Sequence, residues 1–303
     1  MVAKPRRDDR SPFVLAVASG KGGTGKTLVA TNISALLSAQ GLRVVLADCD
    51  VEAPNDHLFL RRAEESSTPV EVLIADVDHA LCTACGRCRD SCAYGAIRML
   101  GGFAIAFDEL CHGCGSCSDV CPSGAIAEVP RRVGEVVVGP VGRDGGVVLV
   151  TGRLDVGQVK SPAVIRAARA AAAALDADLV VLDAPPGVAC SAVAVIRGAD
   201  ALLLVAEPTP FGLHDLELSL TLGNELGLPM GVVVNRDAAS GADVEGLCEA
   251  GDVPILARVP FDRRVAETYA RGELIAEVVP EVATVLAALP DAMRAIASQR
   301  ACR

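Results

Sequence analysis

Ser19-Gly20-Lys21-Gly22-Gly23-Thr24-Gly25-Lys26-Thr27 is the stretch around which this chain of 303 residues is organised. It follows an apolar run at residues 13–18, which has the length of a buried strand, and precedes an Ala- and Leu-rich segment at residues 28–40, which predicts a helix. Between them the residues fit G-x-x-x-x-G-K-[ST], a loop whose backbone N–H groups bind phosphates at the positive end of a helix. We expect Lys26 to reach the β- and γ-phosphates and the hydroxyl of Thr27 to bind Mg²⁺.

This loop holds two of the four lysines, Lys21 and Lys26, in a chain that has 28 Lys and Arg residues and uses arginine almost everywhere else. A compact ammonium group acts as a point charge beside a phosphate, which a planar guanidinium replaces poorly. The alternative is a glycine-rich turn that binds no nucleotide, but the complete motif in its strand-to-helix context favours ATP. The residues predicted to bind the nucleotide here are Gly20, Lys21, Gly22, Gly23, Thr24, Gly25, Lys26 and Thr27.

The pattern Gly-Lys-Gly-Gly-Thr-Gly-Lys-Thr resembles the deviant phosphate-binding loop of the MinD/ParA/Mrp family of ATPases, relatives of the nitrogenase iron protein. The resemblance implies that Lys21 contacts the nucleotide of a partner subunit. It therefore implies an ATP-dependent homodimer, or a heterodimer with a similar ATPase.

Acidic residues follow the next apolar run, residues 43–47, and ligands bind at the carboxyl edge of open α/β sheets. The segment that contains Asp48, Asp50 and Asn55 resembles the first switch of the MinD family. The resemblance implies that Asp50 is catalytic, with Lys21 and Lys26, and that it positions or polarises the attacking water near Mg²⁺. An ordinary turn capped by Asp is the alternative.

A second acidic residue at a strand end is Asp183, in Asp183-Ala184-Pro185-Pro186-Gly187. Its position suits a water-mediated Mg²⁺ contact, and the match to the family's D-x-P-x-G supports that role and implies that Gly187 senses the γ-phosphate. The alternative is that Asp183 caps the helix that follows Val188.

Eight of the twelve cysteines form two runs of identical spacing, C-x-x-C-x-x-C-x-x-x-C, at residues 82–92 and 111–121. This internal duplication has the ligand spacing of bacterial two-cluster ferredoxins, in which the fourth cysteine of a run binds the other cluster. The predicted ligands are Cys82, Cys85, Cys88 and Cys121 for one [4Fe–4S] cluster, and Cys92, Cys111, Cys114 and Cys117 for the other. Zinc is the competing metal, but a zinc ribbon uses two Cys-x-x-Cys pairs and has no need of the further cysteines.

Cys190 lies seven residues after Asp183, where the nitrogenase iron protein has one of two cysteines that bridge a cluster between subunits. Residues 152–155 provide no second such cysteine, so a buried structural thiol is the favoured interpretation. The same interpretation applies to Cys49, Cys248 and Cys302.

Further apolar runs, at residues 178–183, 201–205 and 230–234, alternate with helical sequence. They predict an α/β fold with a doubly wound, mainly parallel sheet of P-loop NTPase architecture. By resemblance, Asn235 and Pro260 contact the adenine. The cysteine runs predict an inserted α+β ferredoxin-like domain at residues 76–129, preceded by a polar linker at 61–69 and containing a hairpin turn at 103–107. The ATPase domain is then divided into residues 1–75 and 130–303.

The formal net charge of −10 argues against general nucleic-acid binding, because no basic surplus exists to neutralise phosphates. No uncharged apolar run is long enough to span a bilayer, and the last helix lacks a basic, bulky apolar face, so we expect no stable membrane association. Cleavage of the N-terminal apolar run as a signal peptide would destroy the ATP loop, which favours a cytoplasmic location.

Three functions fit these features. The leading hypothesis is an ATP-hydrolysing iron–sulfur protein in which nucleotide-dependent dimerisation controls electron delivery to, or maturation of, a partner metalloprotein. The second is a positioning or scaffold ATPase whose clusters are structural or redox-sensing. The third is an Mrp-like iron–sulfur cluster carrier, although two complete sets of four ligands argue against a transferable cluster.

Overall fold

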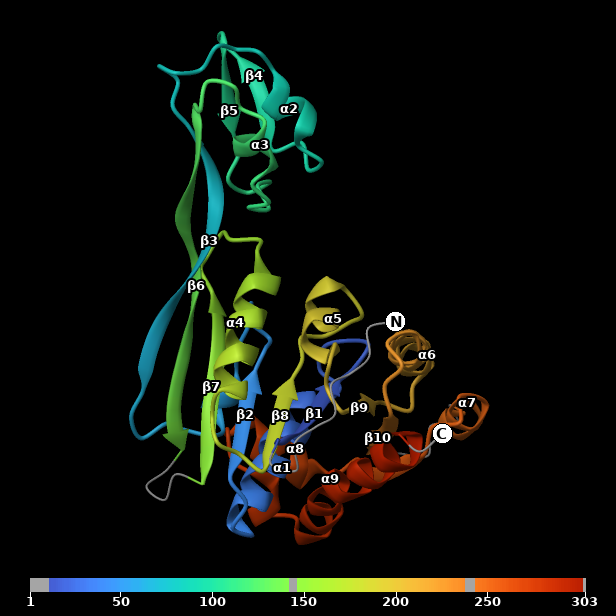
Figure 1. Cartoon of the computed structure of the whole chain (residues 1–303). Coiled ribbons are helices and arrows are strands. Elements are labelled where there is room, and N and C mark those ends of the chain that lie inside the picture. Colours follow the sequence, from blue (N-terminus) through green and yellow to red (C-terminus); the bar gives the residue numbers. More distant parts are fainter. Residues whose placement is uncertain (1–10, 142–145, 238–242, 302–303) are drawn as a thin grey trace.

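The computed structural model describes residues 11–141, 146–237 and 243–301, and a nine-stranded sheet forms its centre (Figure 1). Across the sheet the strand order is β11-β10-β9-β1-β8-β2-β7-β6-β3. All neighbouring strands from β11 to β7 are parallel, whereas β6 pairs antiparallel with both β7 and β3. The strands are β1 (Phe13–Ala18), β2 (Val44–Asp48), β3 (Ser66–Val77), β6 (Ile126–Val141), β7 (Val147–Leu154), β8 (Leu179–Asp183), β9 (Ala201–Ala206), β10 (Met230–Asp237) and β11 (Ile255–Pro260).

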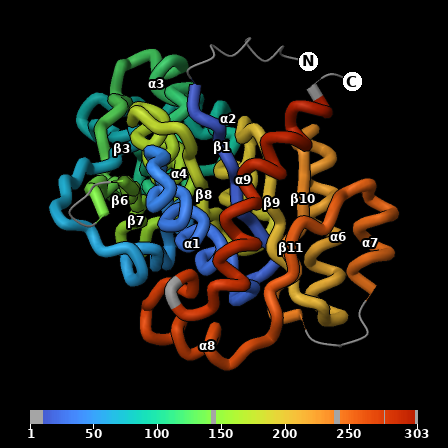
Figure 2. The backbone as a smooth tube through the Cα atoms, turned by 90° about the horizontal axis from the view of Figure 1, so that it is seen from below, coloured from blue at the N-terminus to red at the C-terminus, as the bar shows by residue number. Residues whose placement is uncertain are grey.

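Helices cover both faces of this sheet, so its central strands are apolar on both sides. In β1, Ala16 and Ala18 belong to one core, and Leu15 and Val17 belong to the other. The first core is covered by α4 (Ser161–Ala173), α5 (Cys190–Ile196), α6 (Pro210–Glu225) and α7 (Val244–Ala250). The second is covered by α1 (Lys26–Ala39), α8 (Arg263–Ala270), the 3₁₀ turn η2 (Ile275–Glu277) and α9 (Pro280–Ala301). Figure 2 shows α1 and α9 over the same face. The predicted doubly wound, mainly parallel α/β fold is therefore confirmed.

The cysteine-rich insertion lies at the tip of a long hairpin formed by β3 and β6, which projects beyond the rest of the sheet (Figure 1). Between these strands come α2 (Arg87–Ser91), β4 (Ile97–Leu100), β5 (Phe103–Ala106) and α3 (Ser116–Asp119). The two strands run continuously from the sheet into the insertion, and β3 ends at Val77 while β6 begins at Ile126. The predicted domain limits at residues 76 and 129 therefore fall at the ends of these strands and stay a prediction.

The predicted linker at residues 61–69 is wrong for its second half, because residues 66–69 form the start of β3 and pair with residues 135–138 of β6. Their polarity has another cause: β3 is the edge strand, and its first four side chains are exposed. Pro69 is tolerated there because an edge strand can lack one backbone donor.

The predicted turn at residues 103–107 is also misplaced, because residues 103–106 form β5. The turn is Gly101-Gly102, whose φ angles of +61° and +89° suit a tight hairpin turn that only glycine adopts easily. Within the described residues, no helix is long and apolar enough to cross a membrane.

Candidate functional site

The glycine-rich loop connects β1 to α1 at the carboxyl edge of the sheet, as its sequence predicts, and α1 begins at Lys26. Gly25 has a φ angle of +100°, and a Cβ atom added there would lie 2.2 Å from Nδ2 of Asn235. That amide donates a hydrogen bond of 2.6 Å to the backbone carbonyl of Thr24. Only glycine therefore lets the loop approach β10 this closely.

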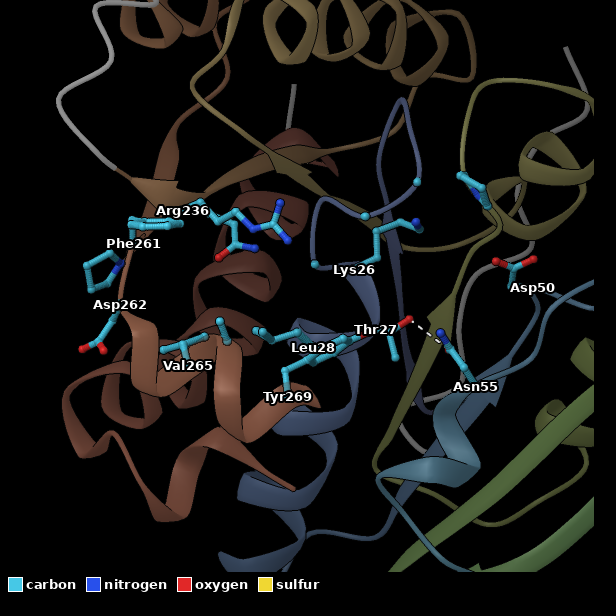
Figure 3. A pocket seen from close by; sticks show the side chains of 17 residues that line it. Lys26, Thr27, Leu28, Asp50, Asn55, Arg236, Phe261, Asp262, Val265 and Tyr269 are labelled. Carbon is cyan, nitrogen blue, oxygen red and sulfur yellow. Dashed lines mark hydrogen bonds between the residues drawn. The ribbon is translucent and has the colours of Figure 1, made fainter. Parts of the chain in front are cut away.

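A cavity opens beside this loop (Figure 3). One end is polar, where the loop meets Asp50 and Asn55, and the other is largely apolar, with Leu28, Val265 and Tyr269. The lining residues are Gly22, Gly23, Gly25, Lys26, Thr27, Leu28, Asp50, Asn55, Pro186, Asn235, Arg236, Pro260, Phe261, Asp262, Val265, Ala266 and Tyr269. Phosphates would fit the polar end and a planar base would fit the apolar end.

At the polar end of the cavity, the hydroxyl of Thr27 contacts the acidic end of β8 and the loop that follows β2. It hydrogen-bonds to Oδ2 of Asp183 at 2.6 Å and to Oδ1 of Asn55 at 3.2 Å. The alternative that Asp183 caps the next helix is wrong, because α5 begins after Ala189 without a side-chain cap. Hydroxyl, carboxylate and amide oxygens are the hard ligands that Mg²⁺ prefers.

Three buried carboxylates belong to this part of the site: Asp183, which contacts the Thr27 hydroxyl directly, and Asp48 and Asp56. Asp48 accepts hydrogen bonds from the backbone N–H groups of Asp50, Asn55 and Asp56 at 3.2, 2.9 and 3.1 Å, so it shapes the loop that carries Asp50. Burial, together with the charge of Asp183, raises the pKa of Asp48 to about 8. Burial also raises the pKa of Asp183 to about 6, against the opposing effects of the Thr27 hydrogen bond and the charge of Lys26.

Sequence reasoning missed Asp56, the first residue of the 3₁₀ turn η1 (Asp56–Leu58). Its side chain is fully buried, and neither carboxylate oxygen has a hydrogen-bond donor within the described residues. Oδ1 of Asp183 likewise has no N–H or hydroxyl donor, although the carboxyls of Asp56 and Asp183 lie close enough to hydrogen-bond to each other when Asp56 is protonated. Burial and the charges of Asp48 and Asp183 raise the pKa of Asp56 well above its usual value. Unpaired buried acceptors beside Thr27 fit a site that a divalent cation completes.

Asp50 and Lys26 line the same polar end, whereas Lys21 does not line the cavity. Burial raises the pKa of Asp50, and the nearby charge of Lys26 partly opposes this rise. Lys21 instead forms an ion pair of 3.2 Å with Glu207, which also pairs with Arg236 at 2.5 Å. Glu207 follows the apolar strand β9, and that position at the carboxyl edge could have identified it from sequence.

Pro260 lines the apolar end, as does Asn235, whose amide is held by the loop carbonyl. Sequence reasoning did not identify Val265 and Tyr269 of α8, or Arg236. For Val265 and Tyr269 the sequence carries no signal of ligand binding, because apolar residues of a helix form the same pattern whether they face a core or a ligand.

The eight clustered cysteines of the insertion fall into two groups around two small cavities. One cavity is lined by Cys82, Cys85, Cys88 and Cys121. The other is lined by Cys92, Cys111, Cys114 and Cys117. Each group thus contains three cysteines of one run and the fourth of the other, which is the crossed arrangement expected from the spacing. Among the described residues, no three His, Cys, Asp or Glu side chains converge tightly enough for a single metal ion.

Backbone N–H groups point at several of these sulfur atoms. The N–H of Ala75 lies 3.5 Å from Sγ of Cys111, that of Ala96 lies 3.3 Å from Cys92, and that of Ala104 lies 3.4 Å from Cys82. Hydrogen bonding of Cys114 with the backbone N–H and the hydroxyl of Ser116 lowers the pKa of this thiol. Donors of this kind stabilise thiolates, which are the form that binds metal.

The remaining cysteines are apart from these groups. Cys49 and Cys248 are buried, in agreement with a structural role. Cys190 is exposed at the start of α5, so its expected burial is wrong. Cys302 lies outside the described residues.

A family model described as the CobQ/CobB/MinD/ParA nucleotide binding domain matches residues 15–275. Two uncharacterised proteins of Methanocaldococcus jannaschii are similar over most of their length. One is 33% identical over 87% of this chain and 90% of that protein, and the other is 27% identical over 86% and 90%. An iron–sulfur cluster carrier protein of Haemophilus influenzae is 42% identical over 55 residues, 18% of this chain and 15% of that protein.

Among solved structures, the septum site-determining protein MinD of Pyrococcus horikoshii, complexed with Mg-ADP, superposes with a TM-score of 0.58. It is 21% identical, and the match covers 94% of this chain and 98% of that one. A ParA family ATPase of Chlorobium tepidum superposes with a TM-score of 0.55 at 16% identity, covering 91% and 98%. At these identities the likeness concerns the fold alone.

Proposed function

Because this chain belongs to the CobQ/CobB/MinD/ParA family of nucleotide-binding domains, we propose that it is an ATP-hydrolysing iron–sulfur protein. In this proposal a nucleotide-dependent dimer controls electron delivery to, or maturation of, a partner metalloprotein. The observation that carries the proposal is the combination of a cavity beside the glycine loop with two four-cysteine groups on a hairpin of the same sheet.

In this proposal each residue at the polar end of the cavity has a role. Backbone N–H groups of the glycine loop and the ammonium of Lys26 would hold the phosphates, and Asp50 would orient the water that attacks the γ-phosphorus. Thr27 and Asp183 would hold Mg²⁺, which neutralises charge on the β- and γ-phosphates. The products are ADP and phosphate. Leu28, Val265 and Tyr269 would enclose the adenine.

Dimerisation is supported by the position of Lys21. Its ammonium lies outside the cavity of its own chain and pairs with Glu207. A second copy placed against this edge would let Lys21 exchange Glu207 for a phosphate of the partner's nucleotide, which is the role that the family resemblance implies for this lysine.

The two cysteine groups fit [4Fe–4S] clusters in donor type and number, since such clusters are held by four thiolates each. A bound cluster would supply one-electron chemistry, accepting one electron from an external reductant and passing it to the partner. The chain's own contribution is to bury Cys88, Cys111 and Cys117, to direct N–H groups at the sulfurs and to leave Cys85 and Cys114 exposed.

The test is electron paramagnetic resonance on anaerobically purified, dithionite-reduced protein, with and without Mg-ATP, together with an iron and zinc count. About eight irons per chain, with signals from two low-potential clusters that change with nucleotide, would support the proposal. About eight irons per chain with signals that do not change when Mg-ATP is added would favour a scaffold ATPase. Zinc in place of iron would exclude the ferredoxin assignment.

A cluster carrier is the second candidate, supported by the short similarity to iron–sulfur cluster carrier proteins. It differs in one measurable outcome. A carrier would transfer iron and sulfide to an apo-ferredoxin on incubation, whereas an electron-transfer protein would keep its iron and exchange only electrons.

Metal binding should depend on pH. Burial raises the pKa of Asp183 to about 6, so this carboxyl is protonated below that pH and competes with the metal. We expect the affinity of the nucleotide complex for Mn²⁺ to fall roughly tenfold per pH unit below about 6 and to level off above 7. The measurement is the free Mn²⁺ signal in titrations from pH 5 to 8, corrected for Mn²⁺ bound by free nucleotide. Asp183→Asn should bind Mn²⁺ weakly at every pH. An equally steep profile in that variant would contradict the assignment.

A further inference from the structure

The loop between β7 and α4, residues 155–160, lies between the carboxyl edge of the sheet and the cysteine-rich insertion (Figure 1). Its core contacts are few, because Val156 and Val159 are 104% and 65% exposed and Gly157 has a φ angle of +83°. Segments with little buried surface change conformation at low cost. The loop is nevertheless anchored at both ends to the two proposed sites.

On the nucleotide side, the anchors are the two residues that directly follow Asp50. The carbonyl of Val51 accepts a hydrogen bond of 2.8 Å from the N–H of Leu154, where the loop begins. The carboxylate of Glu52 accepts one of 2.6 Å from the hydroxyl of Ser161, where α4 begins. Any movement of Asp50 toward a nucleotide would therefore pull on both ends of the loop.

On the cysteine side, the anchor is Lys160, one of the chain's four lysines. Its ammonium donates a hydrogen bond of 2.6 Å to the backbone carbonyl of Asp108 in the insertion. The same carbonyl accepts the backbone N–H of Cys111 at 3.2 Å, and the side chain of Asp108 pairs with Arg131 of β6. The N–H of Cys111 also donates to the carbonyl of Phe107 at 3.0 Å, so Lys160 contacts one of the two carbonyls that hold the backbone of Cys111.

We propose that Lys160 is the positioning residue through which the nucleotide state of the Asp50 segment reaches the cysteine group of Cys111, with the path Glu52, Ser161, Lys160 and Asp108. This inference rests on the proposed ATP binding and adds to it a route between the two sites. The route consists of two hydrogen bonds, Ser161 to Glu52 and Lys160 to Asp108, which the peptide bond between Lys160 and Ser161 joins at the start of α4. A contiguous connection of this kind is one that coupling between sites can use. Coupling is reciprocal, so the state of the cysteine group also acts on the nucleotide site.

The test compares amide hydrogen exchange of the iron-loaded full chain with and without Mg²⁺ and adenylyl imidodiphosphate. In the wild type we expect slower exchange at residues 20–27 and 50–56, and a change of about fivefold or more at residues 107–117. Lys160→Met keeps the length of the side chain but cannot donate, so only the change at 107–117 should disappear. Ser161→Ala, which removes the hydrogen bond from the neighbouring residue to Glu52, should have the same effect.

The matched control is Asp108→Asn, which removes the ion pair with Arg131 but keeps the backbone carbonyl that Lys160 contacts. It should keep the response at residues 107–117. Persistence of that response in Lys160→Met, or its equal loss in Asp108→Asn, would overturn the inference while leaving ATP binding intact. A wild type that responds at 20–27 but not at 107–117 would also overturn it. A wild type that responds nowhere would overturn the proposed function as well.

Discussion

Replacing Asp50 with alanine is expected to slow ATP hydrolysis about 1000-fold, within the range that a positioned acid–base group contributes. Asp50 lines the polar end of the cavity with Lys26, and burial raises its pKa, which makes the carboxylate a better proton acceptor than a free aspartate. Nucleotide affinity should change less than about threefold, because the glycine loop, Thr27 and the apolar end remain. Phosphate release in single turnover and equilibrium titration with a fluorescent ATP analogue separate the two effects.

The control for this prediction is Asp291→Ala, an exposed carboxylate on α9 that pairs, within the described part of the chain, with Arg294 in the next turn of the helix. It should hydrolyse ATP at the wild-type rate, since exposed ion pairs of this kind contribute little. If the dimer is the ATP-bound form, Asp50→Ala should also accumulate as a dimer with ATP in size-exclusion chromatography. A wild-type rate in Asp50→Ala would exclude Asp50 as the residue that positions water.

Replacing Cys121 with serine is expected to remove about half of the iron, leaving roughly four irons per chain. The reason is geometric: Cys121 lines the cavity of Cys82, Cys85 and Cys88, although in sequence it belongs to the other run. The spectrum of reduced Cys121→Ser should therefore match that of Cys88→Ser. It should differ from that of Cys117→Ser, which removes a ligand of the other group. Iron analysis and electron paramagnetic resonance provide both readouts.

The matched control for the cysteine series is Cys190→Ser, which lies outside the insertion at the start of α5 and should keep all of the iron. If Cys121→Ser instead matches Cys117→Ser, each run holds its own cluster and the crossed assignment is wrong. Loss of all iron in Cys121→Ser would mean that the two clusters assemble together, and Cys92→Ser should then behave in the same way.

The sequence alone predicted the elements whose signals are local. The glycine loop between an apolar strand and a helix, the alternation of buried strands with helices, and the two cysteine runs are all patterns within about 20 residues. Such patterns reflect backbone propensity, burial and ligand spacing, which short stretches of chain determine largely by themselves. The edge strand at residues 66–69 was misjudged because strand pairing with residues 135–138, not local polarity, decides its structure.

Only the tertiary structure decided how distant residues meet. Thr27 and Asp183 lie 156 positions apart, and Thr24 and Asn235 lie 211 apart, yet both pairs hydrogen-bond at the carboxyl edge. Contacts between separate elements likewise determine the burial of Asp56, the ion pair of Lys21 with Glu207 and the hydrogen bond from Lys160 to Asp108. The burial, pKa and partners of a side chain depend on the residues that surround it in the folded protein. Many of these residues come from distant segments, and no local sequence pattern indicates which segments will meet.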